Sequence, residues 1–284
     1  LDRDGALAEA IEDGDVVVLR HPHLSDADKA ALSKARLVVC MVTSDRAAWS
    51  WVEILDKQRL MVTSFPQYLH VTGDVPSCNG WRYLPIAFDA RHHEAVQPKP
   101  WSERSGVAFV GSLGSSQWPQ GTYAVAKVAE RCDGFRWWGQ KIGPVGEHLE
   151  RTYAGEAYGL DYLRIMAATK IVLDRHGSVN LVSAYPGAPL RWEAANMRLY
   201  EATGMGALLL TEDAHNIGDL FEPWTECGIY RNPDDLVRVV KHYQKWDDRA
   251  EEIARAGRDM TLLSHTYRDR AEKLLGWIVE AIRG

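Results

Sequence analysis

Three polar side chains near residue 200 have types and spacing that could bind an anionic ligand. In "NMRLYEATGMGALLLTED", Asn196, Arg198 and Glu201 fall on one expected helix, and two glycines separate them from an apolar run. Arg198 and Glu201 are three residues apart and therefore share a helical face. An arginine suits a diphosphate, and a carboxylate farther along the helix suits two ribose hydroxyls. The alternative is an ion pair on a solvated helix.

Two neighbouring features favour the ligand over the ion pair. The helix leads into the very apolar run 207–210, which indicates a central position. It also follows a long loop, 175–192, at the carboxyl end of an expected strand, where open α/β sheets bind ligands. Backbone amides exposed at the start of the helix would help to hold an anion.

A glycine-containing turn supplies a second candidate for anion binding. In "FVGSLGSS", Gly111 and Ser112 follow an expected strand and precede an expected helix. Glycines there let the backbone approach a ligand, and the helix directs amide groups at an anion. The stretch is neither the dinucleotide-binding glycine pattern, with its ribose-holding acid, nor a P-loop. A plain strand–helix turn is the alternative.

The acidic and histidine pairs do not make a convincing metal site. Asp-Gly-Asp at 13–15 precedes a strand as a turn, and Asp-Ala-Asp at 26–28 starts a helix, where acids suit the dipole. His92–His93 and His176 have no companion ligands at metal-binding spacing. We therefore expect no metal ion.

These residues must be positioned by a sheet, because apolar runs and amphipathic segments alternate along the chain. This alternation predicts a parallel sheet covered on both faces by helices. Expected strands are 15–22, 36–42, 59–65, 81–88, 107–112, 135–139, 171–174 and 207–211. Expected helices are 25–35 with Ser25 as its cap, 47–58, 121–132, 159–170, the Asn196–Glu201 helix, 217–221, 232–246 and two more at the end. The polar segment 89–106, with Pro98 and Pro100, indicates a linker and a domain boundary near Pro98.

Composition indicates an ordinary globular protein. The 284 residues are enough for two domains, 46% are apolar, and 25% are charged. The net charge of −6 argues against a general nucleic-acid or membrane-surface binder. No apolar run approaches the roughly 20 residues of a membrane span, and no signal peptide is visible, although a chain beginning at Leu1 could lack a leader. Four cysteines without metal spacing indicate reduced thiols of a cytosolic protein.

At this point the residues resemble a family. The stretch "NMRLYEATGMGALLLTED" resembles the signature of group 1 (GT-B) glycosyltransferases, especially the CgeB-like branch named after a spore maturation protein. That branch has an Asn-x-Arg-x-aromatic-Glu-Ala helix, a glycine-containing turn and an "LLT" strand. His265-Thr266-Tyr267 with Arg270 matches its tail, and "LPIAFD" and "VAFVGS" match its crossing between domains. The resemblance runs from about Leu84 to Leu275.

The resemblance implies an α/β protein of GT-B type, with two Rossmann-like domains facing a cleft. Residues 1–98 would form a reduced, acceptor-side domain, and residues 99–284 a nucleotide-sugar-binding domain whose last helix could pack back on the first. The implied activity is hexosyltransferase-like: transfer of a sugar from a nucleotide diphospho-sugar to the hydroxyl of a glycan or small-molecule acceptor in the cytoplasm, for glycan biosynthesis. No metal, cofactor or nucleic acid would take part.

The resemblance also assigns roles to residues. Glu201 would hold the ribose, and Glu193, the first acid of an E-x7-E pattern, would face the sugar, with retention of configuration favoured by that spacing. Arg198 and amides around Gly111 and Ser112 would face the diphosphate. Asn196, the first residue of the signature, would also belong to the nucleotide-sugar site. The "RWWG" turn with Trp138 and Gly139 lies where relatives bind the base, although its tryptophans could simply fill the core.

Two departures from the family leave roles open. Many relatives carry an Arg and a Lys after the first glycine, whereas "GSLGSSQWPQG" has neither, so Arg198 or Lys141 would have to compensate. His176 could also reach the donor sugar. The second departure is the reduced first domain, where the catalytic base of relatives lies. His21 and His23 in "LRHPHL" are the only attractive candidates there, unless they are solvated loop residues.

Two other functions fit the same pattern. A shortened first domain could leave a non-catalytic nucleotide-sugar-binding module of a larger glycan-synthesis protein. A GT-B-like sugar-nucleotide epimerase is a weaker alternative, which would need no acceptor.

Overall fold

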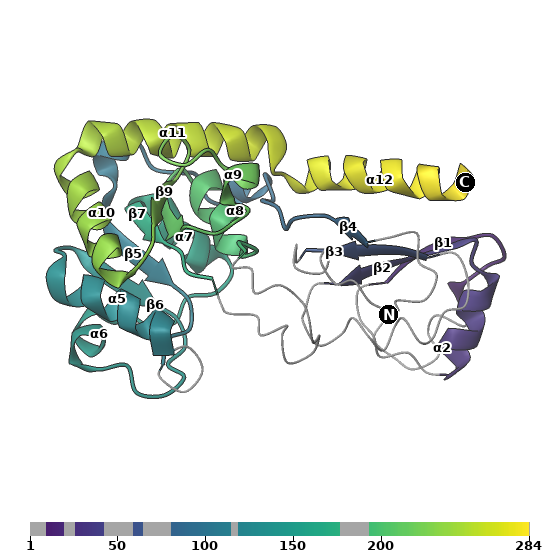
Figure 1. The fold of residues 1–284 in the computed structure, drawn as a ribbon, viewed down its shortest axis with the longest axis horizontal. Coiled ribbons are helices and arrows are strands. Elements are labelled where there is room, and N and C mark those ends of the chain that lie inside the picture. Colours follow the sequence, from purple (N-terminus) through teal and green to yellow (C-terminus); the bar gives the residue numbers. More distant parts are fainter. Residues whose placement is uncertain are drawn as a thin grey trace. The chain divides into compact units, whose positions relative to one another are not determined.

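The computed structural model describes residues 10–19, 26–42, 59–64, 81–114, 119–176 and 193–283. These form two compact units, one from the described residues up to 85 and from 268 onward, the other from those between 86 and 267 (Figure 1). The second unit thus begins before the segment that the sequence marks as a linker. Ser25 and the expected helix 47–58 lie outside the described residues, as does most of the loop 175–192.

The first unit contains a parallel sheet whose strands lie side by side in chain order. The strands are β1 (Val16–Leu19), β2 (Leu37–Val42), β3 (Arg59–Thr63) and β4 (Trp81–Tyr83). Between β1 and β2 lie α2 (Asp26–Ala31) and a single 3₁₀ turn (Leu32–Lys34). Runs of branched apolar residues favour such strands because their side chains pack well on a buried, pleated surface.

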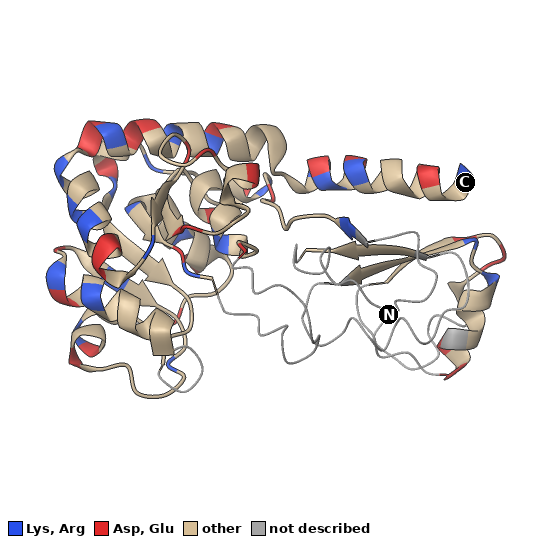
Figure 2. Cartoon of the chain, in the orientation of Figure 1, with Lys and Arg blue, Asp and Glu red and all other residues tan. Residues whose placement is uncertain are grey.

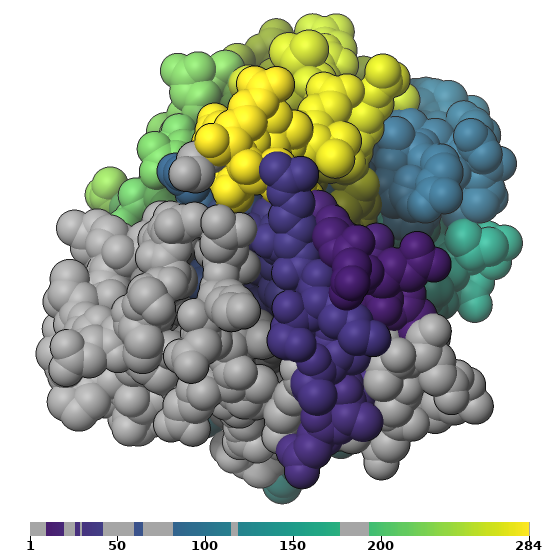
Figure 3. All heavy atoms as spheres, turned by 90° about the vertical axis from the view of Figure 1, so that its right-hand side faces the viewer, coloured from purple at the N-terminus to yellow at the C-terminus, as the bar shows by residue number. Residues whose placement is uncertain are grey.

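The last helix, α12 (Tyr267–Arg283), packs against this sheet. Its apolar side chains Leu274, Trp277, Ile278, Ala281 and Ile282 cover a core made by Leu37, Val39, Leu60, Val62 and Leu84. Near its start, Arg270 Nε donates to the carbonyl of Pro85 at 2.9 Å. Figure 3 shows the yellow helix against the purple amino-terminal segment. Segments from the two ends of the chain therefore share one core.

The second unit is built on a five-stranded parallel sheet in the order β6-β5-β7-β8-β9. Its strands are β5 (Ser105–Val110), β6 (Phe135–Trp138), β7 (Thr169–Leu173), β8 (Leu208–Glu212) and β9 (Gly228–Tyr230). The chain adds β6 on one side of β5 and the later strands on the other. The direction of winding therefore reverses between β5 and β7, the arrangement of a doubly wound fold.

Helices cover both faces of this sheet. They are α4 (His92–Ala95), α5 (Pro119–Arg131), α6 (Glu147–Thr152), α7 (Leu160–Ala168), α8 (Met197–Gly204), α9 (Ile217–Leu220), α10 (Pro233–Lys245) and α11 (Asp247–Ser264), with a 3₁₀ turn at Trp101–Glu103. Alternate strand residues point to opposite faces. Ile171 and Leu173 pack with α5 and α10, whereas Val172 between them packs with α7 and α8. The predicted parallel sheet with helices on both faces is confirmed.

Charged residues are concentrated on the helices, most visibly on α10, α11 and α12 (Figure 2). At the start of α10, the side chain of Asn232 accepts a hydrogen bond from the Asp235 amide at 2.9 Å, and Pro233 follows it. Within the described residues, no helix has the length and apolar character needed to cross a membrane.

Candidate functional site

The turns that follow β5, β6 and β7 meet at one edge of the second sheet. Gly111 and Ser112 follow β5, Gly139 follows β6, and Asp174 follows β7. The Gly111 amide donates to the Trp138 carbonyl at 2.8 Å, which joins the first two turns. Open parallel sheets bind ligands at the carboxyl ends of their strands, where the winding reverses. The structure therefore brings together three residues that the sequence assigns to ligand binding, Gly111, Ser112 and Gly139, and places Asp174 beside them.

The two glycines are required because this corner has no room for a Cβ. A Cβ on Gly139, whose φ is +140°, would collide with the Gly111 carbonyl. A Cβ on Gly111 would lie 2.6 Å from Nη2 of Arg198 and 3.2 Å from the Phe109 ring. The Gly111 turn thus rests directly on the Arg198 guanidinium, and Ser112 beyond it is exposed.

Asp174 is the centre of a buried polar network below these turns. Its side chain is 0% exposed. Oδ1 accepts from Arg198 Nη1 at 2.7 Å and from Asn196 Nδ2 at 3.1 Å, and Oδ2 accepts from Thr211 Oγ1 at 3.0 Å. Burial alone would raise the pKa of Asp174, but the charges of Arg198 and of His176 when protonated, with these hydrogen bonds, lower it below 3.8. The carboxylate therefore stays ionised and fixes its partners.

Arg198 is held at two of its three guanidinium nitrogens. Nη1 binds Asp174, Nε donates to the Val110 carbonyl at 2.9 Å, and the guanidinium lies 4.7 Å from the centre of the Phe109 ring. The side chain is 15% exposed. Within the described part of the chain, Nη2 makes no hydrogen bond, and it is the nitrogen beside Gly111. A positioned cationic donor is thus available at the turn.

Asn196 and His176 tie the loop after β7 to its neighbours. Asn196 precedes α8 but does not cap it, because its amide donates to the Arg175 carbonyl at 2.7 Å as well as to Asp174. His176 is 3% exposed, with Nε2 3.0 Å from Thr211 Oγ1. Its backbone amide donates to Glu212 at 3.0 Å. His176 therefore lies in the network rather than on the surface.

Burial of His176 should make stability depend on pH. Burial lowers the pKa of this imidazole below 6.5, although Asp174 opposes the shift. Near pH 6.5 the unfolded chain then binds a proton at this imidazole that the folded chain does not. The contribution of His176 to the free energy of unfolding is therefore fully present above that pH and is lost as the pH falls below it. Denaturant titrations between pH 8 and pH 5 should show this loss, and His176→Gln should reduce it.

His93 provides the matched control for this pH experiment. Burial lowers its pKa too, and its Nε2 lies 2.8 Å from the Gly204 carbonyl, away from the network. His93→Gln should remove only its own share of the pH dependence. A His176→Gln protein whose stability falls as steeply as that of the wild type would show that His176 is not the source.

Glu201 and Glu193 occupy different environments. Glu201 Oε2 accepts from the Tyr162 hydroxyl at 2.7 Å. Burial raises the pKa of Glu201, while Tyr162 and the charge of Arg198 oppose the shift. Glu193 is buried just before α8, next to Ala194, whose backbone amide donates to the Asn216 side chain at 2.6 Å. Glu201 thus has one carboxylate oxygen anchored by a neighbouring helix.

Lys141 lies at the edge of the same corner but is already engaged. Its ammonium group pairs with Glu150 and lies 4.2 Å from the centre of the Tyr153 ring. The Tyr153 hydroxyl donates to the Gly139 carbonyl at 3.2 Å. Trp137 is fully buried and donates from Nε1 to the Leu149 carbonyl, whereas Trp138 is half-buried. Of the tryptophan pair, only Trp138 is available to a ligand.

Some expectations fall outside this description. His21 and His23 lie outside the described residues. Within the ranges that the structure describes, no three His, Cys, Asp or Glu side chains gather in a way that could hold a metal ion.

Three residues of the network were not assigned to the site from the sequence. Asp174 follows the apolar run "IVL" directly, and a charged residue at the carboxyl end of a buried strand is a signal that could have identified it. Arg175 spans from the Gln120 carbonyl, at 3.2 Å, to Glu212, at 3.4 Å. Tyr162 sits in an ordinary amphipathic helix, where its pattern gives no such signal.

Comparison with known proteins identifies the family. A family described as glycosyl transferase-like matches residues 103–276, which is more than half of the chain. The chain belongs to this glycosyl transferase-like family. It is therefore a glycosyltransferase, and the matched segment includes every described site residue. Among curated proteins, none matches the sequence.

Solved structures show the same fold at low sequence identity. Alr3699/HepE from Anabaena, in complex with UDP and glucose, has a TM-score of 0.68 and 12% identity over 94% of this chain and 78% of its own. A glycosyltransferase from Rickettsia africae has a TM-score of 0.63 and 10% identity, covering 95% and 77%. Sucrose-phosphate synthase from Thermosynechococcus elongatus has a TM-score of 0.59 and 10% identity, covering 93% and 73%. These similarities establish the predicted GT-B fold of the glycosyltransferase.

Proposed function

We propose that this glycosyltransferase takes a sugar from a nucleotide diphospho-sugar bound by its second unit and transfers it to a hydroxyl of a glycan or small-molecule acceptor. The observation that carries the proposal is the placement of Arg198 Nη2 against the Gly111 turn, at the point where the winding of the sheet reverses. The UDP and glucose bound by the similar Anabaena protein support a donor of this class.

Arg198 is assigned to the diphosphate. Negative charge grows on this leaving group as the glycosidic bond breaks, and donors fixed beforehand stabilise it without reorganisation. Asp174 and the Val110 carbonyl fix the guanidinium, and the exposed Ser112 beside it offers a backbone amide, whereas the Gly111 amide is bonded to Trp138. The engaged ammonium group of Lys141 would have to leave Glu150, so we assign it only a peripheral role. Charge stabilisation by Arg198 and amides is the basis for proposing transfer without a metal ion.

The remaining donor contacts follow from the signature and from the geometry. Glu201 would accept hydrogen bonds from the ribose, because Tyr162 holds only one of its carboxylate oxygens. Trp138 and Gly139 would border the base. Glu193 would face the sugar. For His176 to reach the sugar, its Nδ1, which is buried and has no hydrogen-bond partner among the described residues, would have to become exposed when the donor binds. The spacing of Glu193 and Glu201 leads us to propose retention of configuration.

The proposal places the enzyme in the CgeB-like branch, in the cytoplasm and in glycan synthesis. His21 and His23 are its candidates for a catalytic base. Incubating the protein with donor and an acceptor panel tests the transfer, and the anomeric configuration of the product, read by NMR, tests retention. Donor turnover to a free sugar epimer without acceptor would contradict the proposal.

Replacing Glu201 with alanine should weaken nucleotide binding by about 1–3 kcal/mol, the cost of losing hydrogen bonds to a charged group. Calorimetric titration with UDP, GDP, dTDP and CDP identifies the base first, and the variant is then titrated with the best ligand. Tyr162→Phe is the matched control, because it removes the hydroxyl but keeps the carboxylate. Unchanged nucleotide affinity in a folded Glu201→Ala protein would show that Glu201 does not hold the ribose.

A further inference from the structure

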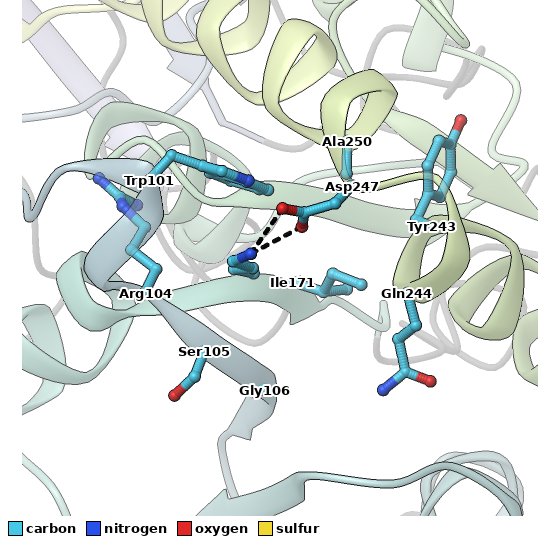
Figure 4. A pocket seen from close by; sticks show the side chains of 10 residues that line it. Trp101, Arg104, Ser105, Gly106, Ile171, Tyr243, Gln244, Asp247 and Ala250 are labelled. Atoms are coloured by element: carbon cyan, nitrogen blue, oxygen red, sulfur yellow. Dashed lines mark hydrogen bonds and ion pairs between the residues drawn. The ribbon is translucent and has the colours of Figure 1, made fainter.

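Two adjoining cavities lie at the opposite edge of the second sheet from the donor site. The first, of about 330 Å³, opens at the amino ends of β5 and β7 (Figure 4). In it Lys170 is paired with Asp247, with 2.7 Å between Nζ and Oδ2. The second, of about 300 Å³, shares Trp101 and Arg104 with the first. Because parallel strands all run the same way, both cavities are separated from the Gly111 turn by the length of the strands.

The second cavity carries a surplus of positive charge. Lys99, Arg104, Arg255 and Arg258 line it, against the single carboxylate of Glu251. In the part of the chain that the structure describes, none of these four cations forms an ion pair within 4 Å, unlike Lys170 in the first cavity. The lining therefore holds three more positive than negative charges, contributed by the 98–104 segment and by α11.

Arg104 has a buried donor that lacks an acceptor. The residue is 6% exposed, and its Nε donates to the Lys99 carbonyl at 2.8 Å. Among the described residues, Nη1 has no hydrogen-bond partner, and neither does the buried Nε of Arg258. Burial and the charge of Arg258 lower the pKa of Arg104 to about 10, so it remains protonated at neutral pH. Buried charged donors without acceptors are costly, and an anion in this cavity would remove that cost.

We propose that the second cavity binds the phosphate group of a phosphate monoester, whose organic part extends past Trp101 into the first cavity. A phosphate dianion offsets most of the surplus charge and has enough oxygen atoms for several guanidinium donors, whereas a carboxylate offsets one charge. Trp101 forms a wall of both cavities and provides an apolar surface between them. The site is separate from the donor site and does not depend on the proposed donor.

Calorimetric titration with inorganic phosphate, at ionic strength held constant with chloride, tests the site. Arg258→Gln and Arg255→Gln should each weaken phosphate binding at least tenfold, and neither removes the buried Arg104. Arg249→Gln is the matched control, because Arg249 lies on the same helix, is paired with Glu252 at 2.8 Å and does not line the cavity. Phenyl phosphate should bind more tightly than inorganic phosphate, and Trp101→Leu should remove that advantage.

Four results would overturn the proposal. The wild-type protein could fail to bind phosphate, or Arg249→Gln could weaken binding as much as Arg258→Gln, which would indicate a general effect of charge. Phenyl phosphate could bind no better than inorganic phosphate. Phosphate binding could also be abolished by Gly111→Ala and retained in Arg258→Gln, which would place the anion at the donor turn instead.

Discussion

Replacing Asp174 with alanine should lower the free energy of unfolding by about 3–5 kcal/mol, the usual cost of removing one partner of a buried ion pair. The carboxylate is fully buried and binds Arg198, Asn196 and Thr211 at 3.1 Å or less. Its loss leaves the Arg198 charge without its counterion and three donors without their acceptor. Urea denaturation followed by tryptophan fluorescence measures the effect.

Two variants calibrate the Asp174 experiment. Asp161→Ala removes an exposed carboxylate from its pair with Arg164, 2.6 Å away on the surface of α7, and should cost less than about 1 kcal/mol. Asp174→Asn keeps the shape and some acceptor capacity and should fall between the two alanine variants. A loss at Asp174→Ala as small as that at Asp161→Ala would show that the network contributes little to stability.

Replacing Gly111 with alanine should reduce kcat/KM for sugar transfer about 100-fold, the loss that a displacement of about 1 Å can cause at a catalytic site. The new methyl group would lie 2.6 Å from Arg198 Nη2, so either the turn or the guanidinium must move. Both are proposed to contact the diphosphate. Gly111 does not have a positive φ, so alanine can adopt its backbone conformation. The change therefore tests the space around the Cβ alone.

Gly218→Ala is the matched control for Gly111→Ala, because a Cβ at Gly218 in α9 would meet nothing within 4 Å. Initial rates with donor and acceptor varied separately measure the effect in both proteins. Equal kcat/KM for Gly111→Ala and Gly218→Ala would mean that the turn and Arg198 do not need their close contact for transfer. A similar fall in both would indicate a general effect on the second unit.

The sheet of the second unit could be predicted because its strands are long apolar runs. Every residue of "IVL" and "ALLL" is apolar, so both faces of such a strand must be buried, and both segments lie in central strands. The three-residue strand at Gly228–Tyr230 and the six-residue helix at Glu147–Thr152 were not predicted. Elements this short show too few repeats of a period to be distinguished from loops.

The position of the candidate site could be predicted, but its hydrogen bonds and ion pairs could not. The turns after β5 and β6 and the start of α8 come together because parallel strands end at one edge. Which nitrogen of Arg198 is available depends on Asp174 and on the Val110 carbonyl, a partner 88 residues away in the sequence. Similarly, the sequence offers Lys141 as a phosphate ligand, but its ammonium group is paired with Glu150. Pairings between distant segments depend on packing, which residue spacing does not encode.

The packing of α12 has a consequence for synthesis on the ribosome. The apolar side chains that cover the first sheet, such as Trp277 and Ile278, are translated only after the entire second unit. Until then Val39 and Leu60 lack that cover, and a nascent sheet with a bare apolar face is prone to aggregate. The strands of the first unit are therefore synthesised before the second unit, but their apolar face is covered only after it. A premature stop codon before α12 would leave that face exposed to chaperones and proteases.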